Sequence, residues 1–470
     1  MKKDFSENIT LQLIFLSLII FISRLPFLWA GFGSEEDSWL LAITSKNIAL
    51  TGNYELSRAP AHPLQEIIYS LLYHGGLSAF SINLLSAIAS VPASIFFALT
   101  LKNIGFKHYL FAAFAFAFTP VVFIASTYTI DYMLAVAFVM GSFYFVVKNN
   151  FVLAGIFLGI AIGFRFTSGA MLIPFCILLF PISNGGIRRI CLFAFTTVVI
   201  GFLTYIPVIK TYGLSFFTFA DQFPYPNLPK IFYKATIGVF GTVGICAILF
   251  YKTKIFIKIF RKKEKIIPKA LPKKLFYASC ICIIIYMVSY LRLPQKSAYL
   301  IPIIPFVILL YGFYYPSIEF RIFCLLLTLS SFLFSMNLTD SIRGANYSPL
   351  AIKFDMAGQR IFLDPLTGPV FSDYTKRLNK IAYTEEVFQK MRTEQKKMVL
   401  ICGWWYNELI VRNWDCEKNQ NVQLVFYIDK STMEKYISSG YEIYYLPEQN
   451  LYNDRFSMMN YTDSVAHPYL

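Results

Sequence analysis

The sequence contains little charge and very little histidine. Of its 470 residues, only 15% are Asp, Glu, Lys or Arg, and four are histidines. A soluble protein of this length has far more polar surface to fill, so the shortage of charge argues against an ordinary soluble fold. The C-terminal part also lacks a Gly-rich phosphate-binding loop and any His/Cys cluster with metal-ligand spacing. No function can be read from that part.

Long apolar runs take the place of the missing charge. Hydrophobic residues make up 56% of the chain, and runs of roughly 17–25 residues, long enough to cross a bilayer, recur over positions 1–338. No small-residue cleavage site follows the first run, which indicates a retained span rather than a signal peptide. The predicted fold class is an α-helical polytopic membrane protein. The predicted spans are 9–30, 80–101, 108–127, 130–147, 151–164, 168–182, 190–208, 235–251, 275–291, 298–315 and 321–338.

The stretch 151–182 decides the predicted topology because Arg165 interrupts it. Each half would reach only about 21 Å as a helix, against a hydrocarbon core of about 30 Å. The segment Lys252–Lys274 carries ten Lys and Arg residues and one Glu. The positive-inside rule puts this segment in the cytoplasm only if 151–182 crosses twice, as a hairpin that turns near Arg165. The sequence thus predicts about eleven spans, a cytoplasmic N-terminus and an extracytoplasmic C-terminal part.

The net charge of +15 does not indicate a nucleic-acid partner. Residues 1–338 hold 27 Lys+Arg against 11 Asp+Glu, whereas residues 339–470 hold 15 against 16. The excess therefore lies in the membrane part, where short basic loops fix the topology. Six of the eight cysteines lie in apolar runs, and Cys402 and Cys416 lie in the tail. These two could pair in an oxidising compartment, and the sequence leaves that open.

Two segments outside the spans show patterns of their own. In segment 31–79, two short helical patterns are separated by prolines, and we expect both helices to lie along the membrane interface. The tail 339–470 alternates β-type runs with helical stretches, which predicts a small extracytoplasmic α/β domain after a membrane domain at 1–338. The predicted strands are 398–402, 422–428 and 441–446, and the predicted helices are 374–394 and 432–438.

Acidic residues gather on the predicted outer face. Before position 339, the acidic residues predicted on that face are Glu35, Glu36, Asp37, Glu55, Glu66, Asp131 and Asp221. Three adjacent carboxylates repel one another, which raises the pKa of at least one and suits a general base that takes a proton from an acceptor hydroxyl. Glu35, Glu36 and Asp37 are therefore catalytic candidates, although a solvated acidic loop would have the same sequence. Asp131 is a second candidate and would equally serve as a helix cap.

A phosphate-bearing substrate would also need cations, with Arg as the better bidentate partner and Lys as a point charge. Arg165 stands out because an Arg between apolar segments is costly unless it is paired or functional; a structural pairing with Asp131 is the alternative. One histidine does not make a metal site. The candidate substrate-binding residues are Arg58, His62, Glu66, Arg165, Arg292, Lys296 and Tyr299.

Together these motifs resemble the membrane glycosyltransferases of the GT-C superfamily, which include the protein O-mannosyltransferases and the aminoarabinose transferases that modify lipid A. The resemblance covers most of residues 1–338 and leaves the tail outside. Many relatives have Asp-Glu in the first outer loop, so which carboxylate of this chain matches stays open. The matching segments are Glu35-Glu36-Asp37-Ser38-Trp39, Ala42 to Gly52-Asn53-Tyr54, Gly155 to Gly159, Arg165 to Ser168, and Arg292 to Pro305.

The resemblance implies an inverting transfer at a bacterial inner or plasma membrane. A sugar would move from a polyprenyl-phosphate-linked donor to a hydroxyl of a lipid, glycan or protein acceptor on the outer face. It implies Asp37 as the base, with Glu36 next, and Arg and Lys residues around the lipid phosphate. Some relatives use a divalent metal, but this chain has no clear Asp-x-Asp motif. We therefore expect no essential metal, and the resemblance leaves a divalent metal open as the one candidate cofactor.

Two other classes of protein remain open. A transporter or flippase of lipid-linked glycans would also place charges in a membrane fold, but transporters usually show repeated halves and polar residues near mid-membrane. This sequence shows no internal repeat, and its charges cluster at one predicted face. A role as a non-catalytic assembly or receptor protein would not explain why three acidic residues are adjacent. The pattern favours the enzyme.

Overall fold

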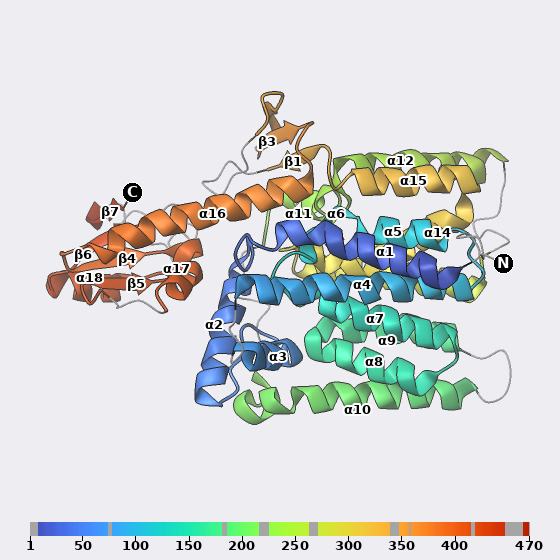
Figure 1. The fold of residues 1–470 in the computed structure, drawn as a ribbon, viewed down its shortest axis with the longest axis horizontal. Helices are drawn as coiled ribbons and strands as arrows, with labels where there is room; N and C mark the ends of the chain where they lie inside the picture. The colour runs from blue at the N-terminus through green and yellow to red at the C-terminus, as the bar shows by residue number, and fades with distance from the viewer. Residues whose placement is uncertain are drawn as a thin grey trace.

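The computed structural model describes most of the chain as a bundle of helices with a smaller α/β part attached to one end (Figure 1). A single long helix, α16 (Pro369–Arg392), runs from the bundle into the smaller part. The described residues are 8–73, 78–180, 186–215, 225–262, 271–338, 347–356, 359–414, 419–446 and 464–469. Asp221, Cys416 and the middle of the basic segment 252–274 lie outside them.

The bundle is built from helices throughout. In chain order its elements are α1 (Ile9–Arg24), η1 (Leu25–Phe27), α2 (Glu36–Thr51), α3 (Pro63–Tyr73), α4 (Ala79–Asn103), α5 (Tyr109–Ala117), α6 (Pro120–Ala125), α7 (Tyr132–Val147), α8 (Phe151–Phe164), η2 (Phe166–Met171), α9 (Leu172–Leu179), α10 (Gly186–Tyr212), α11 (Leu228–Ala235), α12 (Ile237–Lys262), α13 (Lys273–Arg292), η5 (Ser297–Ile303), α14 (Ile304–Tyr314) and α15 (Ser317–Leu329). Helices α2 and α3 lie where the first outer segment predicts two short helices.

Six segments of the described chain are long and apolar enough to cross a membrane, which supports the predicted membrane protein. Three further apolar helices, α7, α8 and the η2–α9 segment, are shorter. The count of about eleven spans therefore stays a prediction. The six segments are Ile9–Phe27, Ala79–Asn103, Ile187–Tyr212, Ile237–Ile257, Lys273–Arg292 and Ser297–Tyr314.

A row of glycines explains how α8 packs against α10. Gly155, Gly159 and Gly163 recur every four residues and so lie on one face of α8. A Cβ added at Gly159 would lie 2.5 Å from the Ile200 Cβ, and one added at either of the other two glycines would lie 2.7 Å from the Cβ of an α10 threonine. Small residues at this spacing let two helix backbones approach closely within a membrane. This packing fixes α8, at whose end Arg165 stands.

The chain reverses direction after α8, as the sequence predicts. Arg165 follows α8 at the end of the bundle that carries α2 and α3. The Phe180 carbonyl, just after α9, accepts a hydrogen bond from the Lys274 Nζ at the start of α13. Since α13 ends at Arg292, near Lys296, the start of α13 and the end of α9 lie at the opposite end of the bundle. The segments α8 and η2–α9 therefore form a hairpin.

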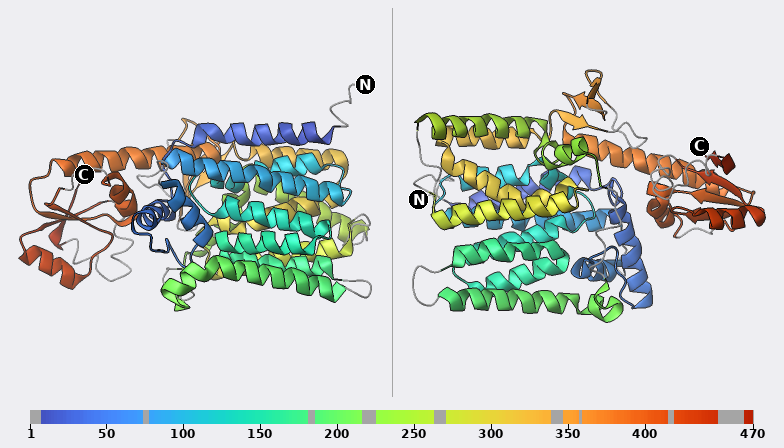
Figure 2. Two further views of the ribbon diagram at one scale, coloured as in Figure 1. Left: turned by 60° about the horizontal axis from the view of Figure 1, so that its bottom comes forward. Right: turned by 180° about the vertical axis from the view of Figure 1, so that it is seen from behind.

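The two ends of the bundle differ in what they carry. The α/β part projects from the end that holds α2 and α3, and the start of α1 lies at the other end (Figure 2). At that second end, the charges of Arg321 and Lys107 act on His108. The two signs of charge do not separate along the bundle axis, because Arg58, Arg165 and Lys296 lie with the acids at the first end and Glu319 pairs with Lys254 toward the second. The structure contains no membrane to orient the two ends.

The small C-terminal part holds two sheets. One has the strand order β5-β4-β6-β7 with all pairs parallel, and the other, next to the bundle, has the antiparallel order β1-β3-β2. The strands are β1 (Ser335–Asn337), β2 (Ile352–Met356), β3 (Gln359–Asp364), β4 (Met398–Ile401), β5 (Val422–Val425), β6 (Glu442–Tyr445) and β7 (Ala466–Pro468), and the remaining helical elements are η6 (Gly403–Trp405), α17 (Tyr406–Arg412) and α18 (Lys430–Ser438).

The predicted strands and helices of the tail match β4, β5, β6, α16 and α18. The β2–β3 hairpin and α17 were not predicted. Strand β2 is exposed along its whole length, so it lacks the alternating burial on which a strand prediction depends. Cys402 is a free, buried thiol.

Buried Arg377 fixes the start of α16 on the bundle. Its guanidinium donates to the Thr127 carbonyl at 3.1 Å and to the Phe27 carbonyl at 3.3 Å, and its Nε lies 3.0 Å from the Asp373 carboxylate. At the other side of the junction, the Lys46 Nζ of α2 lies 4.4 Å from the Trp414 ring centroid. These contacts hold the α/β part against the same end of the bundle that presents the first outer segment.

Candidate functional site

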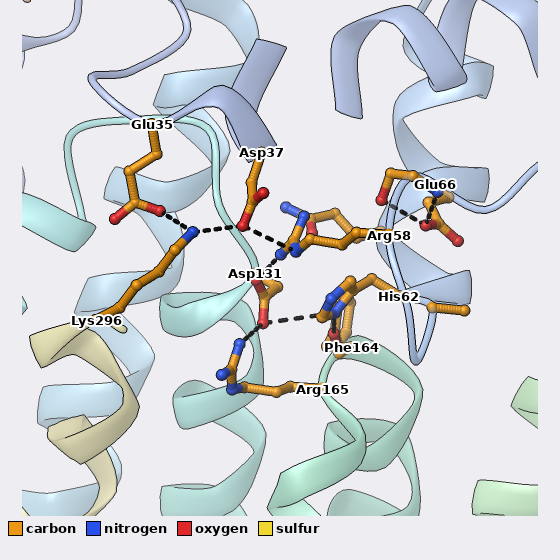
Figure 3. A network of polar contacts seen from close by, with 12 residues as sticks. Glu35, Asp37, Arg58, His62, Glu66, Asp131, Phe164, Arg165 and Lys296 are labelled. Carbon is orange, nitrogen blue, oxygen red and sulfur yellow. Dashed lines mark hydrogen bonds and ion pairs between the residues drawn. The ribbon is translucent and has the colours of Figure 1, made fainter. Parts of the chain in front are cut away.

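Two of the three adjacent acids converge on one lysine. Glu35 is the N-cap residue of α2, and Asp37 lies in its first turn. The Lys296 Nζ, just before η5, lies 2.5 Å from Glu35 Oε2 and also binds Asp37 Oδ2 (Figure 3). The lysine is about 260 residues away in the sequence, so only the tertiary fold brings these groups together.

Arg58 extends this contact into a chain of ion pairs. Its Nε lies 3.4 Å from Asp37 Oδ2, and its Nη2 lies 2.5 Å from Asp131 Oδ1. The other Asp131 oxygen lies 2.7 Å from Arg165 Nη1. Figure 3 shows the resulting row, which we call the ion-pair network: Glu35, Lys296, Asp37, Arg58, Asp131 and Arg165. The network holds three carboxylates and three cations, so its formal charges cancel.

Asp131 occupies the N-cap position of α7 but makes no capping hydrogen bond with its side chain. Its carboxylate is fully buried, and both oxygens are engaged by arginines. The structure therefore realises the pairing with Arg165 that the sequence suggested as an alternative to catalysis. Because Asp131 presents no free oxygen to a substrate, it acts by holding Arg58 and Arg165 in place.

Glu66 holds the loop that carries Arg58. Fully buried in α3, it accepts hydrogen bonds from the Ser57 backbone N–H at 2.7 Å, the Ser57 hydroxyl at 2.6 Å and the Tyr54 hydroxyl. Burial raises the pKa of Glu66 above its ordinary value, against the effect of these donors. The predicted substrate-binding Glu66 is thus a buried anchor for the residue preceding Arg58.

The same loop contains a strained residue. Ala61 adopts a φ of 76°, in the left-handed region that a non-glycine residue rarely occupies. Two hydrogen bonds hold it there: its N–H donates to the Arg58 carbonyl at 2.7 Å, and its carbonyl accepts from the Tyr205 hydroxyl at 3.0 Å. Such strain, retained between Arg58 and His62, is typical of functional sites.

His62 lies beside the ion-pair network without carrying charge. Its Nδ1 lies 2.8 Å from the Phe164 carbonyl and 3.6 Å from Asp131 Oδ2. Burial and the nearby Arg58 lower the pKa of His62 to about 4. A neutral imidazole whose Nδ1–H donates to the Phe164 carbonyl fits this geometry, and it ties the loop to the end of α8.

Aromatic rings hold the guanidinium of Arg165. It lies 4.4 Å from the Tyr132 ring centroid and 5.1 Å from that of Tyr299. A cation over aromatic faces is stabilised by the ring quadrupoles, more strongly when water is excluded. Tyr299, a predicted substrate-binding residue, therefore contacts Arg165.

A cavity of about 300 Å³ opens beside Glu35 and Lys296. It lies between η5, α11, the start of α16 and strand β1, where the bundle meets the α/β part. A volume of this size lies at the small end of ligand pockets. Its polar lining residues are Ser34, Glu35, Tyr128, Tyr233, Lys234, Gln295, Lys296, Ser297, Ser335, Asn337, Ser372, Asp373 and Lys376.

The sequence-based expectation of a raised pKa fails for Asp37. Burial alone would raise it, but Lys296 and Arg58 outweigh burial and hold the pKa of Asp37 below its ordinary value. Burial would likewise lower the pKa of Lys296, and Asp37 and Glu35 raise it instead. The mutual repulsion of adjacent acids is thus overcome by cations from distant segments. Asp37 and Lys296 are therefore both ionised in the folded protein.

Two predicted site residues lie elsewhere. Arg292 is exposed at the end of α13 and forms no ion pair with the described residues of the network. Glu36 lies toward the α/β part, where its charge acts on Cys402. Glu36 is the first residue of α2 and points about 100° away from Asp37, whereas Glu35 precedes the helix in an extended conformation that lets it reach Lys296.

Two cavity lysines were missed. Lys234 lies in a short helix before a span, where flanking lysines are common, and Lys376 lies in the charge-balanced tail. Neither position belongs to a motif, so no signal in the sequence marks them.

The chain's composition offers little for a metal. Within the part of the chain that the structure describes, no group of three or more His, Cys, Asp or Glu side chains could hold a metal ion.

No protein-family model matches the sequence, and no curated protein matches it.

Proposed function

We propose that the protein is a membrane glycosyltransferase that moves a sugar from a polyprenyl-phosphate-linked donor to a hydroxyl of a lipid, glycan or protein acceptor on the outer face. One observation carries the proposal: a carboxylate, Glu35, and an ammonium, Lys296, are side by side in the wall of one cavity. Group transfer from a phosphate needs both a base for the incoming hydroxyl and a cation for the leaving phosphate.

Glu35 is the base in this mechanism, in place of Asp37. Glu35 lines the cavity, whereas Asp37 lies behind Lys296, between that lysine and Arg58. The acceptor oxygen forms a bond to the anomeric carbon of the sugar as the bond from that carbon to the phosphate oxygen breaks. The electron pair leaves with the polyprenyl phosphate, and the hydroxyl proton passes to the Glu35 carboxylate.

Lys296 links donor binding to the activation of the base. At rest it binds Glu35 and Asp37 together. A phosphate that enters the cavity competes for the same ammonium, which loosens its contact with Glu35 and frees a carboxylate oxygen for the hydroxyl. Asp37 and Arg58 keep the lysine near its resting place, and Asp131 keeps Arg58 there. Asp37, Arg58 and Asp131 are positioning residues.

The test combines genetics with a matched pair of variants. The lipids and glycans of cells that lack the gene are compared by mass spectrometry with those of complemented cells. We expect one glycan or glycolipid to lose a single sugar, which also identifies donor and acceptor. Complementation with Glu35→Gln should fail, with transfer reduced about 10²–10⁴-fold, as expected for loss of a general base.

Glu55→Gln is the control. It makes the same chemical change in the same outer segment, where Glu55 accepts a hydrogen bond from the Asn47 side chain 3.0 Å away. It should restore the sugar. Full transfer by a folded Glu35→Gln protein would overturn the proposed base. If deletion instead leaves every structure complete but accumulates a lipid-linked glycan on the cytoplasmic face, the protein is a flippase.

A further inference from the structure

The ion-pair network cannot neutralise a phosphate by itself. Its three carboxylates balance its three cations, so an added anion leaves an uncompensated negative charge in a partly buried place. The cavity next to it does carry additional cations. Lys234 and Lys376 line it, while Asp373, the one further acid among the described lining residues, is paired with Arg377 at 3.0 Å. These two lysines give the cavity a positive excess.

Lys234 reaches the cavity from α11. Its Nζ donates to the Gln295 carbonyl at 2.6 Å, and that residue directly precedes Lys296. Burial, together with Lys230, lowers the pKa of Lys234. An ammonium held in place by a backbone carbonyl keeps two N–H donors for another acceptor.

Lys376 reaches the cavity from the other side, on α16. Its Nζ donates to the Asn337 side-chain oxygen of β1. The adjacent Arg377 fixes this turn of the helix on the bundle. The α/β part therefore supplies one wall of the cavity, and that wall carries a cation.

The outer face of α11 is apolar. Tyr233 and Lys234 line the cavity, whereas the neighbouring Phe232 is 72% exposed and Leu228 is 79% exposed. Phe232 lies two residues before Lys234, and so on the opposite side of this short helix, which means that a ligand with its anionic group on Lys234 reaches the apolar surface by passing around α11. That pairing fits an amphiphile with a phosphate head and a hydrocarbon chain better than it fits a free anion.

We propose that Lys234 and Lys376, together with Lys296, bind the phosphate of a lipid-linked donor, so that the soluble part of the chain completes the donor site. The proposal rests on the proposed function for the identity of the donor. The hydrocarbon chain leaves the cavity along the exposed face of α11. The sugar then lies toward Glu35, on the same cavity wall as Lys296.

The test is a binding measurement on the full-length protein in detergent. Farnesyl phosphate serves as the lipid phosphate probe and inorganic phosphate as the free anion, each titrated by isothermal calorimetry. Lys234→Gln and Lys376→Gln should each weaken farnesyl phosphate binding about tenfold or more, since a hydrogen bond to a charged group is lost. Lys396→Gln, an exposed lysine that pairs with Glu442 at 3.2 Å, is the matched control and should bind as the wild type does.

The outcomes separate this inference from the proposed function. Weaker binding in both variants supports the site even if the wild-type protein transfers no sugar, in which case the proposed function fails alone. If the wild type transfers sugar while both folded variants keep the wild-type affinity and KM, this inference is wrong and the proposed function as a glycosyltransferase remains valid. Equal affinity for inorganic phosphate and farnesyl phosphate would refute the part assigned to the lipid chain.

Discussion

The two halves of the ion-pair network face different surroundings. In the inner half, Asp131 is fully buried between two arginines and beside His62. In the outer half, Glu35 is 25% exposed, Asp37 30% and Lys296 21%, and the cavity lies beside them. Arg58 belongs to both halves, because it binds Asp37 and Asp131.

This difference indicates separate roles. Buried charges that are fully paired hold a fold in one arrangement, and breaking one pair leaves a charge without compensation. Partly exposed charges lose less when a partner leaves, because water replaces it. The inner half is therefore suited to position Arg58 and Arg165, while the outer half can exchange its internal contacts for those of a substrate.

The largest effect on stability should come from the inner half. Asp131→Asn leaves Arg165 without its carboxylate partner and Arg58 with Asp37 alone, which should lower the free energy of unfolding by about 3–5 kcal/mol. Asp37→Asn is the matched control, since it makes the same change against the same Arg58 and should cost about 1 kcal/mol or less. Thermal unfolding in detergent measures both. Equal losses would erase the distinction between the two halves.

A pH-dependent effect should appear at His62. Its pKa is about 4 in the folded protein and 6.5 in the unfolded chain, so only the unfolded chain takes up a proton between these values. Stability therefore falls as the pH drops through that window, by about 2 kcal/mol from this residue at pH 5. Asp37, with its lowered pKa, loses its contribution only below about pH 4.

The comparison of His62→Gln with the wild type isolates this contribution. The variant should lose less stability than the wild type between pH 7 and pH 5, and acidic groups common to both proteins cancel. The charged groups around the ring are Arg58, Asp131 and Arg165. An identical pH dependence in the two proteins would mean that the pKa of His62 is the same in the folded and unfolded protein, so that the Asp131 carboxylate offsets the effects of burial and of Arg58.

The smallest effect should come from the middle acid of the three. Glu36 lies toward Cys402 and away from the cavity, so Glu36→Gln should change sugar transfer by no more than about twofold, as for substitutions away from critical contacts. The test compares the rates of sugar transfer by Glu36→Gln and Glu35→Gln under the same conditions. A loss in Glu36→Gln as deep as that in Glu35→Gln would restore it as a candidate base.

Much of the fold was predictable from local pattern. Apolar runs gave the six long segments that the structure contains, and Arg165 marked the turn of the hairpin. In the tail, alternating patterns located β4, β5 and β6. Periodicity and charge are local signals, so they identify such elements without knowledge of the packing.

The candidate site was predictable only in part. Glu35, Asp37, Arg58, Asp131, Arg165 and Lys296 were candidates from the sequence, and the structure brings them into one network. Chain proximity suggested that Glu36 would share a role with its neighbours, but in the structure it lies toward Cys402 of the α/β part. Lys376 was missed because nothing in the tail indicates which of its helices docks on the bundle.

Hydropathy and charge are properties of short segments, so the sequence alone predicts a bundle of apolar helices and marks the acids and cations between them as candidates. Which of those charges meet depends on the tertiary structure. Lys296 reaches Glu35 and Asp37 across about 260 residues, and with Arg58 it reverses the pKa shift expected from the acids alone. Electrostatic effects depend on distance in space and on burial, and both are fixed only when the helices and the soluble part are packed together.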